Sequence, residues 1–160
     1  MAPGQLNATM RRLFRLPVCL YRWRFSWLLG HRFLLLVHTG RRTGLLRYTV
    51  LEVLEFRNVT CEAIVMSGWG RNADWPRNIK ATPDCIEIVI GSRQFKASYR
   101  LLGDDEAIDA IASYERRNRL LAPIVRAGFT WVLGWRYDGS DMARRRVAAE
   151  KPCIAFRPLR

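Results

Sequence analysis

The first thirty residues follow a helical hydrophobic pattern. Apolar side chains recur at intervals of three or four, which places them on one helical face: Met10, Leu13, Phe14, Val18, Tyr21, Phe25, Leu28 and Leu29. Arginines stand between them, Pro17 interrupts the pattern, and Gly30 is a stop signal. The pattern predicts a basic amphipathic helix over residues 1–31, kinked or divided at Pro17.

Two interpretations of this helix stay open. Its apolar face can pack on the rest of the domain and leave the arginines in water, or the helix can lie in a membrane interface. Trp23, Phe25 and Trp27 stand close to arginines, which suits a lipid headgroup boundary. We expect no membrane span over 18–37, because each of its three arginines would cost about 2.5 to 3.5 kcal/mol near the bilayer centre.

The middle and the end of the chain have strand patterns. Short β-rich segments separated by turn residues predict strands over 33–39, 47–56, 60–67, 84–90, 93–102 and 152–156. Gly91 and Ser92 form a two-residue link with glycine first, which is typical of a type II′ hairpin. The strand after this link alternates, with Phe95, Ala97, Tyr99 and Leu101 on its apolar face.

Helical signals lie between and after these strands. Asp74 and Pro76 suit the start of a short helix over 74–81. Three acidic residues from Asp104 open a longer helix that Pro123 should bend or divide. Its apolar positions are Ile108, Ile111, Leu121, Ile124 and Val125, and an aromatic patch follows over 128–137. Strands outnumber helices without βαβ alternation, so the expected fold is mainly β with added helices (α+β), a β-barrel rather than a doubly wound sheet.

Composition indicates one basic globular domain. The chain has 160 residues, 49% of them hydrophobic, and a net charge of +13. A nucleic acid, an acidic membrane surface or a polyanionic small molecule is therefore a plausible partner. No recognition helix or RNA-binding motif is evident, which disfavours nucleic acid. We expect residues 1–31 to precede a single cofactor-binding barrel domain over 32–160.

The cysteines and histidines indicate no metal site. Cys19, Cys61, Cys85 and Cys153 stand far apart, so we interpret them as reduced, mostly buried thiols of an intracellular protein. The chain has two histidines, His31 and His38, which we interpret as strand-end or packing residues. We therefore predict no metal.

The segment from Thr39 to Arg47 contains two glycines and three arginines directly after the first strand. Glycines allow tight backbone geometry with exposed amides, and the guanidinium groups of Arg41, Arg42 and Arg47 suit a phosphate or carboxylate. The alternative is a basic hairpin loop without a ligand. The chain has no Walker loop, complete dinucleotide fingerprint or nucleophile elbow, so any enzymatic activity would come from a bound cofactor.

Two motifs resemble a known family. LLLVHTGRRTGLLR, residues 34–47, resembles the TTGRKSGxxR signature of the deazaflavin (F420)-dependent nitroreductases. VMSGWG (65–70) and WPRNIKATP (75–83) look like the same family's ASxGG strand end and WyxNLxAnP helix. The resemblance implies a split β-barrel that binds coenzyme F420, a deazaflavin with a phosphate and an oligoglutamate tail. Flavin mononucleotide (FMN) stays a less favoured alternative, because related split barrels accept it.

The resemblance also implies site residues. Arg42 matches the position that meets the cofactor phosphate, and Arg47 the second basic position. Ser67 and Gly68 match the strand end beside the ring. The expected cofactor-binding residues are Arg41, Arg42, Thr43, Gly44, Arg47, Thr49, Val50, Ser67, Gly68, Trp69, Trp75, Asn78 and Lys80. On the substrate side we expect Ser67 to stabilise developing charge, with Trp135 and Tyr137, or else Trp131, beside the acceptor.

The expected function is that of an oxidoreductase which transfers a hydride from reduced F420 to a lipophilic acceptor, such as a quinone or a nitro or other conjugated compound. The alternative is a noncatalytic F420- or lipid-binding protein with the same barrel. We expect a cytoplasmic monomer or homodimer, with contact to the anionic inner face of the plasma membrane under the membrane interpretation of the first helix.

Overall fold

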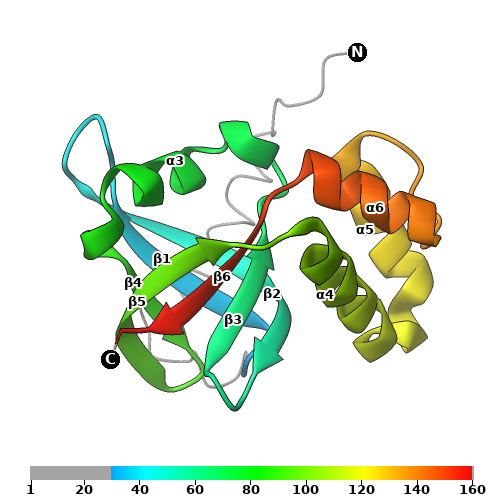
Figure 1. The fold of residues 1–160 in the computed structure, drawn as a ribbon, viewed down its shortest axis with the longest axis horizontal. Coiled ribbons are helices and arrows are strands. Elements are labelled where there is room, and N and C mark those ends of the chain that lie inside the picture. The colour runs from blue at the N-terminus through cyan, green and yellow to red at the C-terminus, as the bar shows by residue number, and fades with distance from the viewer. Residues whose placement is uncertain (1–29, 160) are drawn as a thin grey trace.

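The computed structural model describes residues 30–159 as an antiparallel barrel with helices packed at one end and on one side (Figure 1). The strands close in the order β1-β2-β3-β6-β5-β4. Their bounds are β1 (Phe33–Thr39), β2 (Leu46–Arg57), β3 (Glu62–Met66), β4 (Glu87–Ile90), β5 (Arg93–Leu101) and β6 (Cys153–Pro158). The predicted α+β barrel fold is confirmed.

The barrel has one apolar core inside and a second one outside. Side chains from all six strands fill the interior, among them Leu36, Val65 and Phe156. Ile64 and Ala155 point the other way, into a cluster shared with the helices. β3 and β6 are thus covered on both faces, which explains why their sequences are apolar runs without polar alternation.

Within residues 30–159, four α-helices and three short 3-10 helices accompany the barrel. They are η2 (Gly70–Asn72), α3 (Asp74–Ala81), η3 (Pro83–Cys85), α4 (Asp104–Arg117), η4 (Arg119–Leu121), α5 (Ala122–Leu133) and α6 (Asp141–Glu150). α3 packs against β1 and covers one end of the barrel, whereas α4 lies beside β2 and packs against α6 (Figure 1). Among residues 30–159 no helix is long and apolar enough to cross a bilayer.

Most predicted strands and the short helix are observed. α3 has the predicted bounds, and Gly91 has a φ of +56° in the β4–β5 hairpin, as a type II′ turn requires. The predicted strand over 84–90 is shorter, because η3 occupies its beginning and β4 starts at Glu87. The predicted N-terminal helix falls on residues outside the described part of the chain.

The second half agrees with the predictions only in part. The long helix is divided near Pro123, as predicted: α4 ends at Arg117, and α5 begins with Pro123 in its first turn. Leu121, Ile124 and Leu101 were expected on apolar packing faces but are exposed. α6 was not predicted at all, because its sequence carries three consecutive arginines and a weak apolar stripe.

The cysteine prediction was wrong in part. Of the three cysteines in the described residues, only Cys153 is buried, whereas Cys85 is exposed. Burial raises the pKa of the Cys153 thiol to about 12, so this thiol stays protonated at neutral pH. His31 stacks on Phe56 with 4.2 Å between ring centroids, as the packing interpretation predicts.

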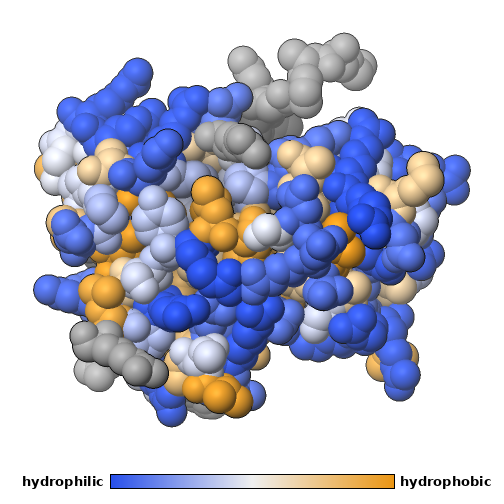
Figure 2. Space-filling view, in the orientation of Figure 1, coloured by the Kyte–Doolittle hydropathy of each residue, from blue (hydrophilic) through white to orange (hydrophobic). Residues whose placement is uncertain are grey.

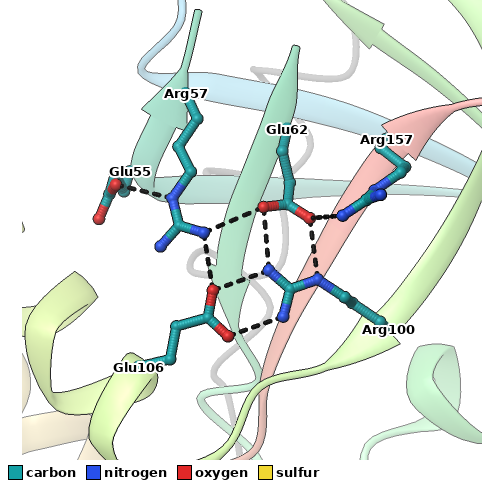
Figure 3. Close-up of polar contacts among 6 residues, drawn as sticks. All are labelled: Glu55, Arg57, Glu62, Arg100, Glu106 and Arg157. Atoms are coloured by element: carbon teal, nitrogen blue, oxygen red, sulfur yellow. Dashed lines mark hydrogen bonds and ion pairs between the residues drawn. The ribbon is translucent and has the colours of Figure 1, made fainter. Parts of the chain in front are cut away.

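An ion-pair cluster joins four strands to α4 (Figure 3). Glu62 on β3 is 2% exposed, and its carboxylate accepts hydrogen bonds of 2.9 to 3.1 Å from Arg57, Arg100 and Arg157. Glu106 on α4 accepts 2.7 Å bonds from Arg57 and Arg100. Burial alone would raise the pKa of Glu62, but the hydrogen bonds from Arg100 and Arg157 outweigh it and hold this pKa below its usual value. The Glu62 carboxylate therefore stays charged at neutral pH.

Candidate cofactor site

A cavity of about 920 Å³ opens beside the end of the barrel that α3 covers. Three parts of the chain line it: the β1–β2 loop with the strand ends beside it, the segment from Met66 through α3, and the last turns of α5. The lining residues are His38, Gly40, Arg41, Arg42, Thr43, Arg47, Tyr48, Thr49, Val50, Leu51, Met66, Gly68, Trp69, Ala73, Asp74, Trp75, Asn78, Trp131 and Val132. Its volume lies in the range of cofactor pockets.

The β1–β2 loop is closed by its own backbone. The carbonyl of Gly40 accepts hydrogen bonds from the amides of Thr43 (3.1 Å) and Gly44 (2.8 Å), and the Gly40 amide donates to the Leu45 carbonyl (2.8 Å). Gly44 has a φ of +66°, which favours glycine there. A Cβ at Gly40 would lie 3.0 Å from Thr43 Oγ1. The glycines of the motif therefore shape the turn.

The prediction of exposed loop amides was wrong, because those of Gly40, Thr43 and Gly44 already donate within the turn. The Arg41 amide donates to Asn78 Oδ1 on α3 (3.2 Å). Recognition of an anion by this loop must therefore come mainly from side chains.

Arg41 fastens the loop to α3. Its Nη1 donates to Asn78 Oδ1 and to Asp74 Oδ1, at 2.9 Å each. The hydrogen bond from Arg41 lowers the pKa of the Asp74 carboxyl below its usual value, so this pair is charged at neutral pH. Because Arg41 already donates to Asp74 and Asn78, its guanidinium group is only partly available to a ligand.

Arg42 and Arg47 are different. Both line the cavity and both are exposed. Among the described residues neither has a carboxylate within ion-pair distance, so their guanidinium groups give this side of the cavity a net positive charge. Two free guanidinium groups and a third beside them suit a multiply charged anion.

A hydrogen-bonded chain runs from Arg41 to the cavity wall. Asn78 Oδ1 accepts from Arg41, so Asn78 Nδ2 must be the donor toward His38 Nδ1, 3.3 Å away. His38 then carries its proton on Nε2 and donates it to Thr49 Oγ1 at 3.2 Å. The Thr49 hydroxyl is left to donate in turn, and Thr49 lines the cavity.

His38 is held neutral within this chain of hydrogen bonds. The residue is 2% exposed, and burial lowers the pKa of its imidazole below the usual value. A neutral His38 with its proton on Nε2 is the form that the two hydrogen bonds require. The packing interpretation of His38 thus describes its burial but misses its position at the cavity.

The opposite wall of the cavity is apolar and aromatic. Trp75, 7% exposed, packs between the cavity and Phe156 of the barrel core, and Met66 and Leu51 lie beside it. At the mouth, Trp69 and Trp131 meet edge to face with 5.8 Å between ring centroids. A flat conjugated ring fits a wall of this kind.

Gly68 allows α5 to approach this wall. A Cβ on Gly68 would lie 3.0 Å from Val132 Cγ1, closer than real Cβ contacts normally come. Ten of the predicted cofactor-binding residues line the cavity: Arg41, Arg42, Thr43, Arg47, Thr49, Val50, Gly68, Trp69, Trp75 and Asn78.

The structure places other predicted residues away from the cavity. Ser67 is buried, and its hydroxyl donates to the Gly70 carbonyl at 2.8 Å, which fixes the turn after β3. Gly44 lies at the outside of the loop, and Lys80 is exposed near the end of α3. These three residues support the lining but do not belong to it.

Trp135 and Tyr137 belong to the helical cluster instead. The Trp135 indole donates to Glu150 (3.0 Å), and the buried Tyr137 hydroxyl donates to Glu115 (3.1 Å). Neither residue lines the cavity, so the structure does not bring these two substrate-side candidates to the site. The third candidate, Trp131, does lie at its mouth.

Sequence reasoning missed several lining residues. Asp74 was predicted only as a helix start, and Tyr48, Leu51 and Met66 only as parts of strands. The alternation of β2 contained a usable signal, because Thr49 and Leu51 lie on the same face of that strand. Val132 had no such signal, since its place depends on how α5 packs on the barrel.

The cavity fits F420 in its chemistry. Arg42 and Arg47 offer donors to the phosphate and the oligoglutamate tail, and the wall at Leu51, Met66 and Trp75 offers an apolar surface to the ring.

Comparison with known proteins bears on the same point. A sequence model of the family described as F420H2-dependent quinone reductase matches residues 24–120, more than half of the chain, whereas no curated protein matches it.

Solved structures agree with the fold. An F420-H2 dependent reductase has a TM-score of 0.51 at 17% identity, over 80% of this chain and 96% of its own. A structure described as a domain-swapped dimer gives 0.50 at 16% identity, over 88% and 98%. A protein of unknown function from Agrobacterium tumefaciens gives 0.52 at 12% identity, over 99% of this chain and 59% of its own. At these identities the likeness shows the fold alone.

The resemblance to a deazaflavin-dependent family is confirmed, although the family model that matches is that of quinone reductases and not of nitroreductases. The cofactor implied by the family is F420, as predicted. The chain belongs to the F420H2-dependent quinone reductase family and is a split-barrel reductase that depends on this deazaflavin.

Proposed function

We propose that this enzyme reduces a lipophilic conjugated acceptor, such as a quinone, at the mouth of the cavity. One observation carries the proposal: a single cavity joins an arginine-bearing loop to an apolar, aromatic wall that reaches the surface at Trp69 and Trp131. An anionic cofactor handle and a lipophilic acceptor thereby find complementary surfaces in the same cavity.

When bound, reduced F420 supplies the hydride. Arg42 and Arg47 would hold its charged tail, and Val50, Gly68 and Trp75 would line the place of the ring. Trp69 and Trp131 would exclude water from the acceptor. The Thr49 hydroxyl, which accepts a hydrogen bond from His38, would be free to donate one to a ligand oxygen.

The test is oxidation of reduced F420 in the presence of menaquinone-like acceptors, with the protein saturated by cofactor. We expect turnover that depends on enzyme concentration and acceptor. Tight cofactor binding without turnover for any quinone, nitro or conjugated acceptor would favour the noncatalytic F420- or lipid-binding alternative.

We further propose that the basic aromatic segment 1–31 brings the enzyme to an anionic membrane surface on the cytoplasmic side. The proposal is supported by the arginines and tryptophans of that segment and by the net charge of +13. A variant lacking residues 1–30 should bind anionic vesicles more weakly and keep its cofactor. Unchanged vesicle binding would argue against this role of the segment.

A further inference from the structure

The outward face of η4 and α5 is apolar. Leu120 is 89% exposed, Ile124 is 69% exposed and Trp131 is 53% exposed, although each is a large hydrophobic residue. Along α5 only Phe129 is buried. A helix in water normally turns its apolar side inward, so this arrangement needs an explanation.

The exposed apolar residues form one continuous stripe. Leu120, Ile124 and Trp131 are spaced by four and seven residues, and the exposed Ala127 and Gly128 lie between the last two. The polar residues of α5, Arg126 and Thr130, come two and six positions after Ile124, which places them on the side of the helix away from the stripe. By contrast, the surface over α4 and α6 is mostly hydrophilic (Figure 2).

Arginines border this stripe. A hollow of about 230 Å³ beside α5 is lined by Glu115, Ala122, Val125 and the arginines Arg116, Arg119, Arg126 and Arg144. Arg144 is paired with Glu115 and Asp141. Within the described part of the chain, Arg116, Arg119 and Arg126 have no carboxylate partner at ion-pair distance.

The stripe leads to the cofactor cavity. Trp131, at its end, lines the cavity and contacts Trp69 across the mouth, and Trp69 is itself 52% exposed. A lipophilic molecule that leaves a membrane beneath α5 would therefore meet the cavity without crossing water.

We propose that η4 and α5 dock on an anionic lipid membrane, with Leu120, Ile124 and Trp131 in the acyl boundary and Arg116 and Arg119 at the headgroups. α5 has 12 residues, about 18 Å of helix, so it would lie in the interface and not span the bilayer. The inference rests on the proposed function, because it supplies the route by which a lipophilic acceptor reaches the site.

Charge favours a membrane over a second copy of the chain. A symmetric pairing through the stripe would bring Arg116 and Arg119 of two copies toward one another, and the Glu115 carboxylate that lines the hollow is already paired with Arg144. An anionic lipid surface supplies the opposite charge and covers the apolar stripe at the same time.

The test uses the full chain and vesicles of phosphatidylcholine with or without about 30% phosphatidylglycerol, which gives the vesicles a strong negative surface charge. The variant L120E/I124E should bind the anionic vesicles at least about tenfold more weakly, since it lacks two apolar side chains that enter the membrane in the proposed complex. V59E is the matched control, because Val59 is fully exposed in the turn between β2 and β3. It should bind like the parent protein.

A second pair of variants tests the charge. Arg116→Gln and Arg119→Gln should each lower binding to anionic vesicles by about fivefold and leave binding to neutral vesicles unchanged. Equal vesicle binding by L120E/I124E and V59E would overturn the proposal. So would a stripe that proves to join two copies, seen as a parent dimer that L120E/I124E converts to monomer in sedimentation without any vesicle binding.

Failure of this inference is distinguishable from failure of the proposed function. L120E/I124E should keep its affinity for F420 and its turnover of a water-soluble quinone, and lose turnover only of a long-chain quinone embedded in vesicles. If no quinone is reduced by the parent protein, the proposed function fails, whereas the vesicle-binding comparison still decides whether α5 docks on the membrane.

Discussion

Arg42 and Arg47 differ from Arg41 in what they can offer a ligand. Arg41 already donates to Asp74 and Asn78, whereas the other two have no carboxylate partner among the described residues. The free guanidinium groups should therefore contribute most of the cofactor's electrostatic affinity, and Arg41 mainly the position of the loop.

We expect Arg42→Ala to weaken F420 binding by about 1.5 to 3 kcal/mol, the size of a hydrogen bond to a charged group. Calorimetric titration measures this directly. Arg77→Ala is the control, because Arg77 on α3 donates to Asn72 and does not line the cavity. Equal affinity of the two variants would show that the loop does not bind the charged tail.

His38 should make stability depend on pH. Burial holds the folded pKa of His38 below its usual value, while the unfolded imidazole titrates near about 6.5. Below that pH the unfolded state binds more protons, so the free energy of unfolding falls as the pH drops from about 6.5 and levels off below the folded pKa. Above about 6.5 the contribution is fully present.

Urea denaturation between about pH 5 and 7.5 tests this dependence, because this pH range lies above the titration of unfolded carboxyl groups. His38→Gln should flatten the curve in this window. In the nitrogen NMR spectrum of the parent, the His38 proton should reside on Nε2. A proton on Nδ1 would contradict the hydrogen-bonded chain from Arg41 to Thr49.

At the scale of elements, the Glu62 cluster joins β2, β3, β5, β6 and α4. Glu62→Gln should lower the free energy of unfolding by about 2 to 3 kcal/mol, because a neutral amide replaces the buried carboxylate that three guanidinium groups share, while Arg57 and Arg100 keep only Glu106 and Glu55 as charged acceptors. Glu55→Gln is the milder comparison, with a loss of about 1 kcal/mol or less, since Glu55 pairs with Arg57 alone. Chemical denaturation that ranks them in the reverse order would contradict this assignment.

Acid should weaken the same cluster in a lower pH range. Hydrogen bonds from Arg100 lower the pKa of Glu106 to about 2, and an unfolded glutamate titrates near about 4.3. The stabilisation by Glu106 is therefore complete above about 4.3 and is lost as the pH falls toward 2. In denaturation curves over this range, Glu106→Gln should show a smaller loss of stability than the parent protein.

The strands were more predictable from sequence than the last helices. β1 and α3 have the predicted bounds because their apolar periodicity and turn residues agree. α5 contains apolar residues on nearly every side, so its sequence does not show which side is buried and which is exposed. α6 has the opposite problem, since a helix with three consecutive arginines and two buried residues carries little pattern.

At the scale of the molecule, the barrel was predictable but its site only in part. The loop after β1 and the short α3 are local motifs, and the cavity brings them together. His38 and Trp131 join them only through tertiary packing, β1 against α3 in one case and α5 against the turn after β3 in the other. Trp135 and Tyr137 lie close to Trp131 in sequence, yet the helix end turns them toward another core.

The whole cavity can be tested with one comparison, a calorimetric titration of F420 and flavin mononucleotide into the same preparation. The account predicts saturable one-to-one binding of F420 that weakens with salt, and at least about tenfold weaker binding of flavin mononucleotide, which lacks the oligoglutamate tail. Absence of saturable heat with F420, or equal affinity for the two compounds, would contradict the claim that this cavity binds the deazaflavin through Arg42 and Arg47.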